Sequence, residues 1–432
     1  MSPERIQNDA ATCMSRRRVM KLMQSSALFT GIPMMTARDA EKRSSERPKS
    51  LVVLWMNGGM SQLETWDPHP GTESGGEVAD IATSARGIRI SELLPQMAEE
   101  MHSCMLIRSL TSKEGDHERG AAFVRTGYRM EPALKYPTLG AIVAHELPGK
   151  DHGIPGYVSL SPALRMAEGG YLGGEWNAFK VFNPGKRPSN LENHVAEHRV
   201  AARMRGLKVV RDTFGRNRST AFEETRYTQT LEGALSMMNS EQLNAFEIER
   251  ESVSVQASYG STPFGSGCLV ARRLIESGVR SVEIHLSGFD THAANHDGHV
   301  ALCGTLDPAA AALIRELRDR DLLESTIVLC ISEFGRTPGI NQAGGRDHWP
   351  NWFSCMIAGG GFRSGVVWGE TPGAILTSKI PQPGSPVSIP QLMATIMKSM
   401  GIDSARELLT PVGRPMLLAG GKPIDELLMS GG

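Results

Sequence analysis

Short apolar runs, each long enough for one strand and separated by helical patterns, constrain the fold of this 432-residue chain most strongly. A strand that is buried on both faces of a parallel sheet has this kind of sequence. The runs are SLVVLWMNGG (50–59), CMLIRSL (104–110), SVEIHLS (281–287), TIVLCIS (326–332) and WFSCMIAGGG (352–361). Strands that alternate with helices predict a doubly wound, mostly parallel α/β sheet sandwiched by helices.

Three segments show helical spacing of apolar residues. Residues 263–278 predict a helix that ends at Gly278, residues 304–325 predict one that starts at Asp307 and Pro308, and residues 388–402 predict an amphipathic helix near the C-terminus. The stretch from about 190 to 260 is rich in polar helix formers, and we expect it to be a helical insertion or cap in the α/β domain.

The N-terminus predicts export. The stretch SRRRVMK (15–21) precedes an apolar run of 14 residues, followed by a charged, Ser/Pro-rich segment. This pattern indicates a twin-arginine-type signal peptide over residues 1–40 and a linker over 41–49, ahead of a domain at 50–425. An amphipathic N-terminal helix is the alternative. The apolar run is shorter than the roughly 20 residues that span a bilayer, so we expect no membrane span and a periplasmic or secreted protein that uses the twin-arginine export machinery.

Charge and cysteine content exclude some classes of protein. With 46 basic and 47 acidic residues, the formal net charge is −1, which favours neither nucleic acid nor an anionic membrane as partner. Cys13 lies in the predicted signal, and the other five cysteines show no C-x-x-C spacing. Cys330 and Cys355 fall in strand-like runs, so we expect buried free thiols rather than a disulfide framework.

Polar residues gather where the predicted strands end. Asn57 and Ser61 follow the first run, and three further clusters follow or precede later runs. Because the carboxyl ends of parallel strands meet at one edge of a sheet, a ligand site is expected there. Imidazole nitrogen with carboxylate oxygen suits zinc or manganese, and an oxygen-richer set suits calcium or magnesium. The predicted metal ligands are Asp290, His292, Glu333, Asp347 and His348.

Other residues of these clusters have two interpretations each. His296 and His299 are either alternative ligands or part of a solvated loop, and they rank below His292. Arg336 either clamps an oxyanion with its fork of donors or pairs with Glu333. The tryptophans of the last cluster either form an apolar wall for a sugar or pack in the core; these are Trp349 and Trp352.

The motifs as a group resemble a known family. They are NGGMSQLETWDPHP, RSLTSKEGDHERGAAFVRTG, YPTLGAIVAHE, GFDTHAANHDGH, SEFGRTPGINQAGGRDHWP and IAGGGFRSGVVWGET. Together they resemble the domain of unknown function 1501 (DUF1501) family of secreted bacterial proteins, from about Lys49 to the C-terminus. That family is similar to the alkaline-phosphatase and sulfatase superfamily, so the resemblance implies an α/β sandwich with metal ligands at the strand ends.

The resemblance also implies roles for individual residues. Asp290 with His292 corresponds to an Asp and His pair of the superfamily, His348 to its late metal histidine, and Glu333 stands where many members have S-D-H-G. The first strand of the superfamily ends in a ligand aspartate, whereas this chain has Asn57 at that turn. This departure weakens the expectation of a complete two-metal site.

The position of the nucleophile differs as well. HERGAAFVRTG reproduces the spacing of the sulfatase motif, with His117 where the cysteine would stand. His117 is therefore predicted to be a ligand, a general acid/base or a nucleophile on phosphorus, or else a histidine at a helix entry bonded to backbone. Ser61 is a lesser nucleophile candidate, and Cys104 lacks the rest of the motif that a modified cysteine requires.

These observations predict an exported, metal-dependent hydrolase of phosphate or sulfate esters, with a small molecule or a polysaccharide as substrate. The expected metal is zinc, manganese or calcium. His117, Arg336 and Ser61 are the predicted catalytic residues. The alternative is a non-catalytic protein that uses the same fold to bind a glycan or a protein partner.

Overall fold

The structure, a computed structural model, describes residues 50–148, 153–161, 168–188, 196–215, 237, 240–372 and 382–429. The predicted signal peptide and linker lie outside these residues. In the part of the chain that is described, no helix is long and apolar enough to cross a membrane.

A mixed, mostly parallel sheet of nine strands forms the centre of the fold, in the order β12-β4-β11-β8-β1-β7-β5-β6 with β13 also paired to β4. Its strands are β1 (Ser50–Asn57), β4 (Cys104–Thr111), β5 (Tyr157–Leu160), β6 (Phe179–Val181), β7 (Ser281–Ser287), β8 (Thr326–Ile331), β11 (Phe353–Gly359), β12 (Val366–Trp368) and β13 (Val387–Ser388). All five apolar runs form strands of this sheet, as predicted. The order, with its long crossovers between neighbouring strands, confirms the α/β fold class.

One strand runs against the others. Strand β11 pairs antiparallel with both β4 and β8, whereas every other pairing in this sheet is parallel. The apolar run 352–361 predicted a strand but carries no information about its direction. Because β11 is reversed, the loop that precedes it lies at the edge where the other strands have their carboxyl ends.

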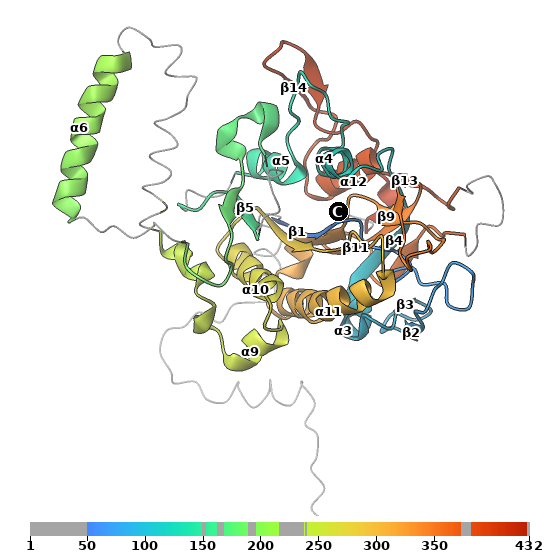
Figure 1. Ribbon diagram of the computed structural model, residues 1–432. Helices are drawn as coiled ribbons and strands as arrows, with labels where there is room; N and C mark the ends of the chain where they lie inside the picture. Colours follow the sequence, from blue (N-terminus) through green and yellow to red (C-terminus); the bar gives the residue numbers. More distant parts are fainter. Residues whose placement is uncertain are drawn as a thin grey trace, which may run out of the picture. The chain divides into compact units, whose positions relative to one another are not determined.

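Alternate residues of the strands enter two separate hydrophobic cores. Val52, Leu54 and Met56 of β1 face one core with helices α3, α10 and α11. Leu51 and Trp55 face the other core with α4, α5 and α12. Figure 1 shows these two helix layers on opposite sides of the sheet. Both faces of β1 are therefore buried, which is why its sequence is continuously apolar.

The helices of these layers are α3 (Pro95–Glu100), α4 (His117–Thr126), α5 (Leu139–Glu146), α10 (Pro263–Glu276), α11 (Asn295–Asp319) and α12 (Ile389–Ser399), with the short α9 (Val253–Ser258) beside them. Helices α10 and α12 confirm two of the predicted segments. Three antiparallel strand pairs lie outside this sheet: β2 (Asp80–Ala82) with β3 (Arg89–Ser91), β9 (Gly335–Arg336) with β10 (His348–Trp349), and β14 (Glu407–Leu409) with β15 (Pro415–Leu417).

The predicted start of α11 was wrong. The helix begins at Asn295 and contains Pro308 in its interior, so it starts well before the expected Asp307. Asp307 caps another helix instead, because its carboxylate accepts hydrogen bonds from the backbone N–H groups of Gln96 and Met97 in the first turn of α3 (3.0 and 2.7 Å).

The predicted helical insertion at about 190–260 lies partly outside the described residues. Within it the structure describes helix α6 (Glu197–Gly215), the 3-10 turns Glu241–Phe246 and Ile248–Arg250, and α9.

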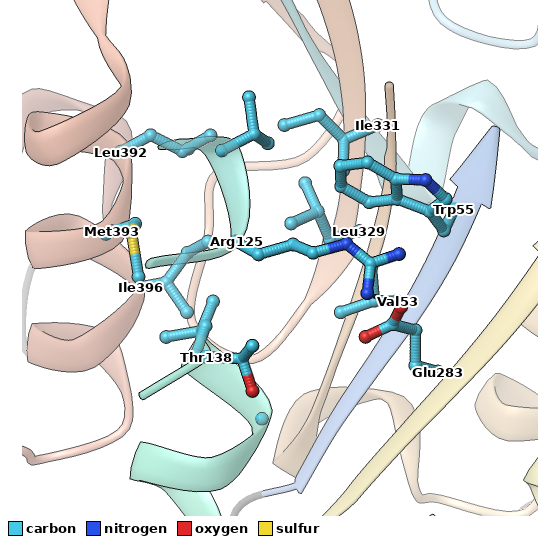
Figure 2. A pocket seen from close by; sticks show the side chains of 13 residues that line it. Val53, Trp55, Arg125, Thr138, Glu283, Leu329, Ile331, Leu392, Met393 and Ile396 are labelled. Carbon is cyan, nitrogen blue, oxygen red and sulfur yellow. Dashed lines mark ion pairs between the residues drawn. The ribbon is translucent and has the colours of Figure 1, made fainter. Parts of the chain in front are cut away.

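A buried ion pair lies between the sheet and helix α4. The guanidinium of Arg125 lies 4.0 Å from the ring centroid of Trp55, and its Nη1 is 2.5 Å from Oε1 of Glu283 on β7. Figure 2 shows Arg125 extending from the helix layer, where Leu392 and Met393 of α12 lie, toward Glu283 on the sheet. The cavity beside this pair has a volume of about 30 Å³, the size of one water molecule.

Candidate metal centre

Three connections meet at the carboxyl edge of the sheet, as the strand ends predicted. Asp290 and His292 follow β7, and the connection from β8 to the reversed strand β11 carries Glu333, Arg336 and, in β10, His348. The loop after β4 adds a further residue, because helix α4 starts there with His117. Because β11 is reversed, the residues that precede it lie at the same edge of the sheet as the residues that follow the parallel strands.

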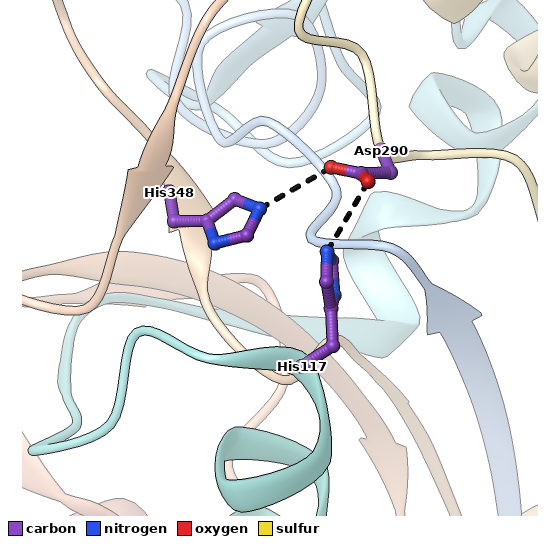
Figure 3. Close-up of side chains that lie close together, drawn as sticks. All are labelled: His117, Asp290 and His348. Carbon is purple, nitrogen blue, oxygen red and sulfur yellow. Dashed lines mark hydrogen bonds and ion pairs between the residues drawn. The ribbon is translucent and has the colours of Figure 1, made fainter.

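Three histidines surround the Asp290 carboxylate (Figure 3 shows two of them). The Nε2 atoms of His117, His348 and His292 lie 3.3, 3.3 and 3.1 Å from the carboxylate oxygens. The Nε2 atoms of His292 and His348 are 3.0 Å apart. Ligand atoms of His117, Asp290 and His348 all lie within 4.8 Å of one another, which is close enough for one ion.

Glu333 lies behind His117 rather than beside Asp290. Its Oε1 is 2.8 Å from Nδ1 of His117 and also accepts the backbone N–H of Gly58 at 2.9 Å. Its other oxygen accepts the hydroxyl of Ser332 (3.2 Å), and the side chain is 1% exposed. Because an ionised carboxylate only accepts hydrogen bonds, His117 carries its proton on Nδ1. The hydrogen bond with Glu333 also raises the pKa of His117 above its usual value, against the effect of burial.

The other two histidines are held in the same way. Nδ1 of His292 is 2.7 Å from Oδ1 of Asp347, and Nδ1 of His348 is 2.7 Å from the carbonyl oxygen of Gly115. Both partners are acceptors, so each ring donates from Nδ1 and turns Nε2 toward the centre. Predicted ligands Glu333 and Asp347 therefore orient histidines, whereas Asp290, His292 and His348 face one another.

The donor set fits a divalent cation. Histidines that ligate a metal usually donate their other ring N–H to a carboxylate or backbone carbonyl, which fixes the tautomer, and all three rings have such a partner. Apart from its 3.3 Å ion pair with Asp290, the buried Nε2 of His117 has no hydrogen-bond partner in the described part of the chain. Two imidazole Nε2 atoms 3.0 Å apart need a proton or a metal ion between them. Both observations are what an ion bound by Nε2 atoms and Asp290 would require.

Arg336 forms an ion pair with Asp290. Of the two interpretations of this residue, neither describes its contacts: it pairs with Asp290, not Glu333, and its side chain is fully buried. Nη2 donates to Oδ1 of Asp290 at 2.6 Å and to the carbonyl of Gly58, while Nε and Nη1 donate to the carbonyls of Gly59 and Arg346 (2.8 and 3.0 Å). Its donors are thus used within the protein.

This pairing sets the charge of Asp290. Burial alone would raise the pKa of the carboxyl, but the hydrogen bond and charge of Arg336 and the neighbouring histidines outweigh it and lower the pKa to about 2. The Asp290 carboxylate is therefore ionised at neutral pH, as a metal ligand must be. The hydrogen bond between Asp347 and His292 likewise lowers the pKa of Asp347.

A glycine permits the close approach of two loops of the centre. A Cβ at Gly345 would lie 1.9 Å from the carbonyl oxygen of His292, so only glycine fits there. The same loop places Asn341, whose amide donates to the carbonyl of His292 at 3.0 Å. The glycines of GGRDHWP thus bring Asp347 and His348 to the loop that follows β7.

The structure keeps Ser61 and His299 out of the centre, and His296 lies in the first turn of α11. His299 is fully buried in the second turn of α11, where Nε2 accepts the backbone N–H of Ser61 (3.0 Å) and Nδ1 donates to the carbonyl of Asn295 (2.9 Å). Burial lowers the pKa of His299. Ser61 is also fully buried, and its hydroxyl oxygen accepts from the backbone of Leu63. The ranking of His299 below His292 agrees with this arrangement.

The remaining candidates are in the core or point elsewhere. The side-chain oxygen of Asn57 accepts a hydrogen bond from the Trp55 indole at 3.4 Å. Trp352 is fully buried, in keeping with the core-packing interpretation. The described cysteines are free and buried, as predicted, and burial raises the pKa of Cys104.

Comparison with known families identifies the chain. The family model described as "Protein of unknown function (DUF1501)" matches residues 48–428. The chain belongs to the DUF1501 family. This match confirms the resemblance of the sequence motifs, and it covers every residue of the candidate centre. A comparison with curated proteins returns no match for this DUF1501 member.

Solved structures with a similar fold include several hydrolases. The PsFucS1 sulfatase from Pseudoalteromonas sp. shares 12% identity with a TM-score of 0.38, over 91% of this chain and 74% of that one. The phosphonate monoester hydrolase of Agrobacterium radiobacter shares 8% identity with a TM-score of 0.39, over 89% and 78% of the two chains. At these values the likeness does not specify an activity for the DUF1501 protein.

Proposed function

We propose that this DUF1501 protein is a metal-dependent hydrolase of phosphate or sulfate esters. The observation that carries the proposal is the set of three histidines whose Nδ1 protons are held by acceptors and whose Nε2 atoms face the ionised Asp290. The ester class comes from the similarity of the family to the alkaline-phosphatase and sulfatase superfamily.

The metal we propose is zinc or manganese, held by His117, His292, His348 and Asp290. Three imidazole nitrogens with one carboxylate suit these ions, whereas calcium prefers six to eight oxygen ligands. A bound divalent ion would polarise an ester oxygen or lower the pKa of a bound water.

The protein residues bind, orient and expose this centre. Glu333 and Asp347 fix the ring planes and tautomers of two histidines, and Arg336 holds Asp290 in place. The side chains of Asp290 and His292 are each 48% exposed, so an ester group has access to this side of the centre.

Two observations concern the nucleophile and the number of metal ions. The described cysteines are buried within the fold, so none of them presents a thiol nucleophile to an ester, which favours attack by water. The side chain of Asn57 bonds with Trp55, which supports a single ion rather than the two-metal arrangement. Asn57 stands where the superfamily has a ligand aspartate. This difference also favours the second candidate, a non-catalytic protein that binds a glycan or a partner.

We also propose that the protein is exported in folded form. The arginine pair and short apolar run of residues 1–40 support a twin-arginine-type signal. That route would let the centre acquire its metal before transport. Replacing both Arg16 and Arg17 by Lys should retain the protein in the cytoplasm, as measured by cell fractionation, and unchanged export would contradict the proposal.

The activity is tested with aryl phosphate, phosphonate and sulfate esters on protein reconstituted with zinc or with manganese. We expect turnover of at least one ester class with one ion, and its loss by about a hundredfold or more in His348→Ala. His299→Ala serves as a control, because that histidine is buried outside the centre. If the reconstituted protein binds one ion but hydrolyses none of these esters, the binding candidate replaces the hydrolase.

A further inference from the structure

A second cavity lies against helix α4, away from the metal ligands. Its volume is about 300 Å³, at the lower end of the range of small-molecule sites. We call it the tyrosine pocket. Its lining includes Glu118, Ala122 and Thr126 of α4 and Tyr128, Glu131 and Tyr136 of the segment that follows.

The tyrosine rings are fixed in place by contacts within the protein. Tyr128 and Tyr136 stack with ring centroids 4.6 Å apart and planes 14° from parallel, and Tyr171 contacts Tyr136 edge-on at 6.4 Å. The hydroxyl of Tyr128 donates to the carbonyl of Leu417, and that of Tyr136 donates to the Glu131 carboxylate, both at 2.7 Å. A ligand would therefore meet rigid, amphipathic rings at little cost in conformational entropy.

Most charges around the pocket are paired. Arg125 pairs with Glu283 (2.5 Å) and Lys135 with Glu168 (3.4 Å).

Glu131 lies 3.8 Å from Arg414, and Glu118 is exposed in the first turn of α4, where the helix dipole favours a negative charge. The lining thus offers ring surface and carboxylate oxygens that accept hydrogen bonds. Such a lining suits an uncharged ligand that carries many hydroxyl groups.

Helix α4 connects the pocket with the metal centre. His117 is its first residue, and Glu118, Ala122 and Thr126 follow at intervals of four, so they share a neighbouring face of the helix. The far end of that face is about 13 Å along the axis from His117. A chain of a few sugar units is long enough to lie in the pocket and reach the centre.

We propose that the tyrosine pocket binds uncharged sugar units of a glycan. Ring faces would pack against the C–H faces of the sugars, and the carboxylates of Glu131 and Glu118 would accept hydrogen bonds from their hydroxyl groups. In this arrangement the unit that carries the phosphate or sulfate ester lies at the metal centre, a step that rests on the proposed function. The substrate would then be a polysaccharide rather than a free small ester.

The test is binding of neutral oligosaccharides to the full chain. An array of hexasaccharides of glucose, mannose, galactose, xylose and fucose identifies a ligand, and calorimetry measures its affinity. Tyr136→Ala removes a ring and Ala122→Trp fills the cavity from the helix side; both should weaken binding about tenfold or more. Phe182→Ala is the matched control, because Phe182 is an aromatic residue 69% exposed on another part of the chain, and it should bind as the wild type does.

Two results would overturn the proposal: no hexasaccharide bound at millimolar concentration, or equal binding by wild type and Ala122→Trp. The second variant keeps the test valid if Tyr136→Ala does not fold. His348→Ala separates this proposal from the proposed function. Sugar binding that survives in that variant supports the pocket whether or not the wild type hydrolyses esters.

Discussion

Glu333→Gln should weaken metal binding although Glu333 is not itself placed as a ligand. Glutamine has nearly the same shape, so its carbonyl can still accept from Gly58 and from Nδ1 of His117. The charge-assisted hydrogen bond to His117, at 2.8 Å and with Glu333 only 1% exposed, becomes a neutral one. Changes of partners behind metal-ligating histidines typically lower metal affinity by 10- to 100-fold, which corresponds to about 1.4 to 2.7 kcal/mol.

Asp347→Asn is the matched control for this substitution. Asp347 makes the same kind of contact with His292, at 2.7 Å, but its side chain is 57% exposed. Water replaces a lost contact at such a position, and exposed charge pairs contribute about 1 kcal/mol or less. We therefore expect a loss of about fivefold or less in the control.

Competition for zinc with a chromogenic chelator at pH 7 measures both affinities. Thermal unfolding of the metal-free proteins shows whether each variant is folded. If Glu333→Gln binds zinc as tightly as the wild type, or if Asp347→Asn loses more affinity than Glu333→Gln, the assignment of Glu333 as the orienting partner of His117 is wrong.

Three further predictions concern His299, the Arg125–Glu283 pair and Gly345. His299→Ala should lower the free energy of unfolding by about 1–3 kcal/mol, because the buried N–H of Ser61 loses its acceptor, yet leave metal occupancy unchanged in elemental analysis; a loss of metal would contradict the structural role of His299. Burial raises the pKa of Glu283, but the charge of Arg125 and the other partners lower it to about 2 from its ordinary value of 4.5. This pair therefore stabilises the fold above pH 4.5, and about 3 kcal/mol of the free energy of unfolding is lost as the pH falls from 4.5 toward 2. Urea unfolding should show that the free energy of unfolding declines less steeply with falling pH in Glu283→Gln than in the wild type. Equal slopes in the two proteins would refute the assignment. Gly345→Ala should reduce metal occupancy, since its Cβ would collide with the loop after β7; full occupancy would show that the loop adapts.

The sequence predicted the sheet and the edge where the site lies, because continuous apolar runs and the polar residues after them are local features. It did not predict that β11 is reversed, since an apolar strand reads the same in either direction. It predicted a loop for His296 and His299, although both lie in α11. Pro308 suggested a helix start, and only the packing of the helix shows that this proline is tolerated in its interior.

The ligand set shows a second limit of sequence. Asp290, Glu333 and Asp347 are all carboxylates at strand ends, but only the folded positions distinguish the one that faces the histidines from the two that lie behind them. His117 was identified as a candidate through the family resemblance. A local signal for the start of its helix was also present, because Asp116 is the N-cap residue of α4. The tyrosine pocket draws on residues that no motif joins.

Elemental analysis of the protein purified from cells without a metal-binding tag tests the central claim most directly. We expect about one equivalent of zinc or manganese in the wild type, lost in Asp290→Ala and His348→Ala and retained in His299→Ala. No bound metal in the wild type, or equal occupancy in all three variants, would contradict the metal centre described above.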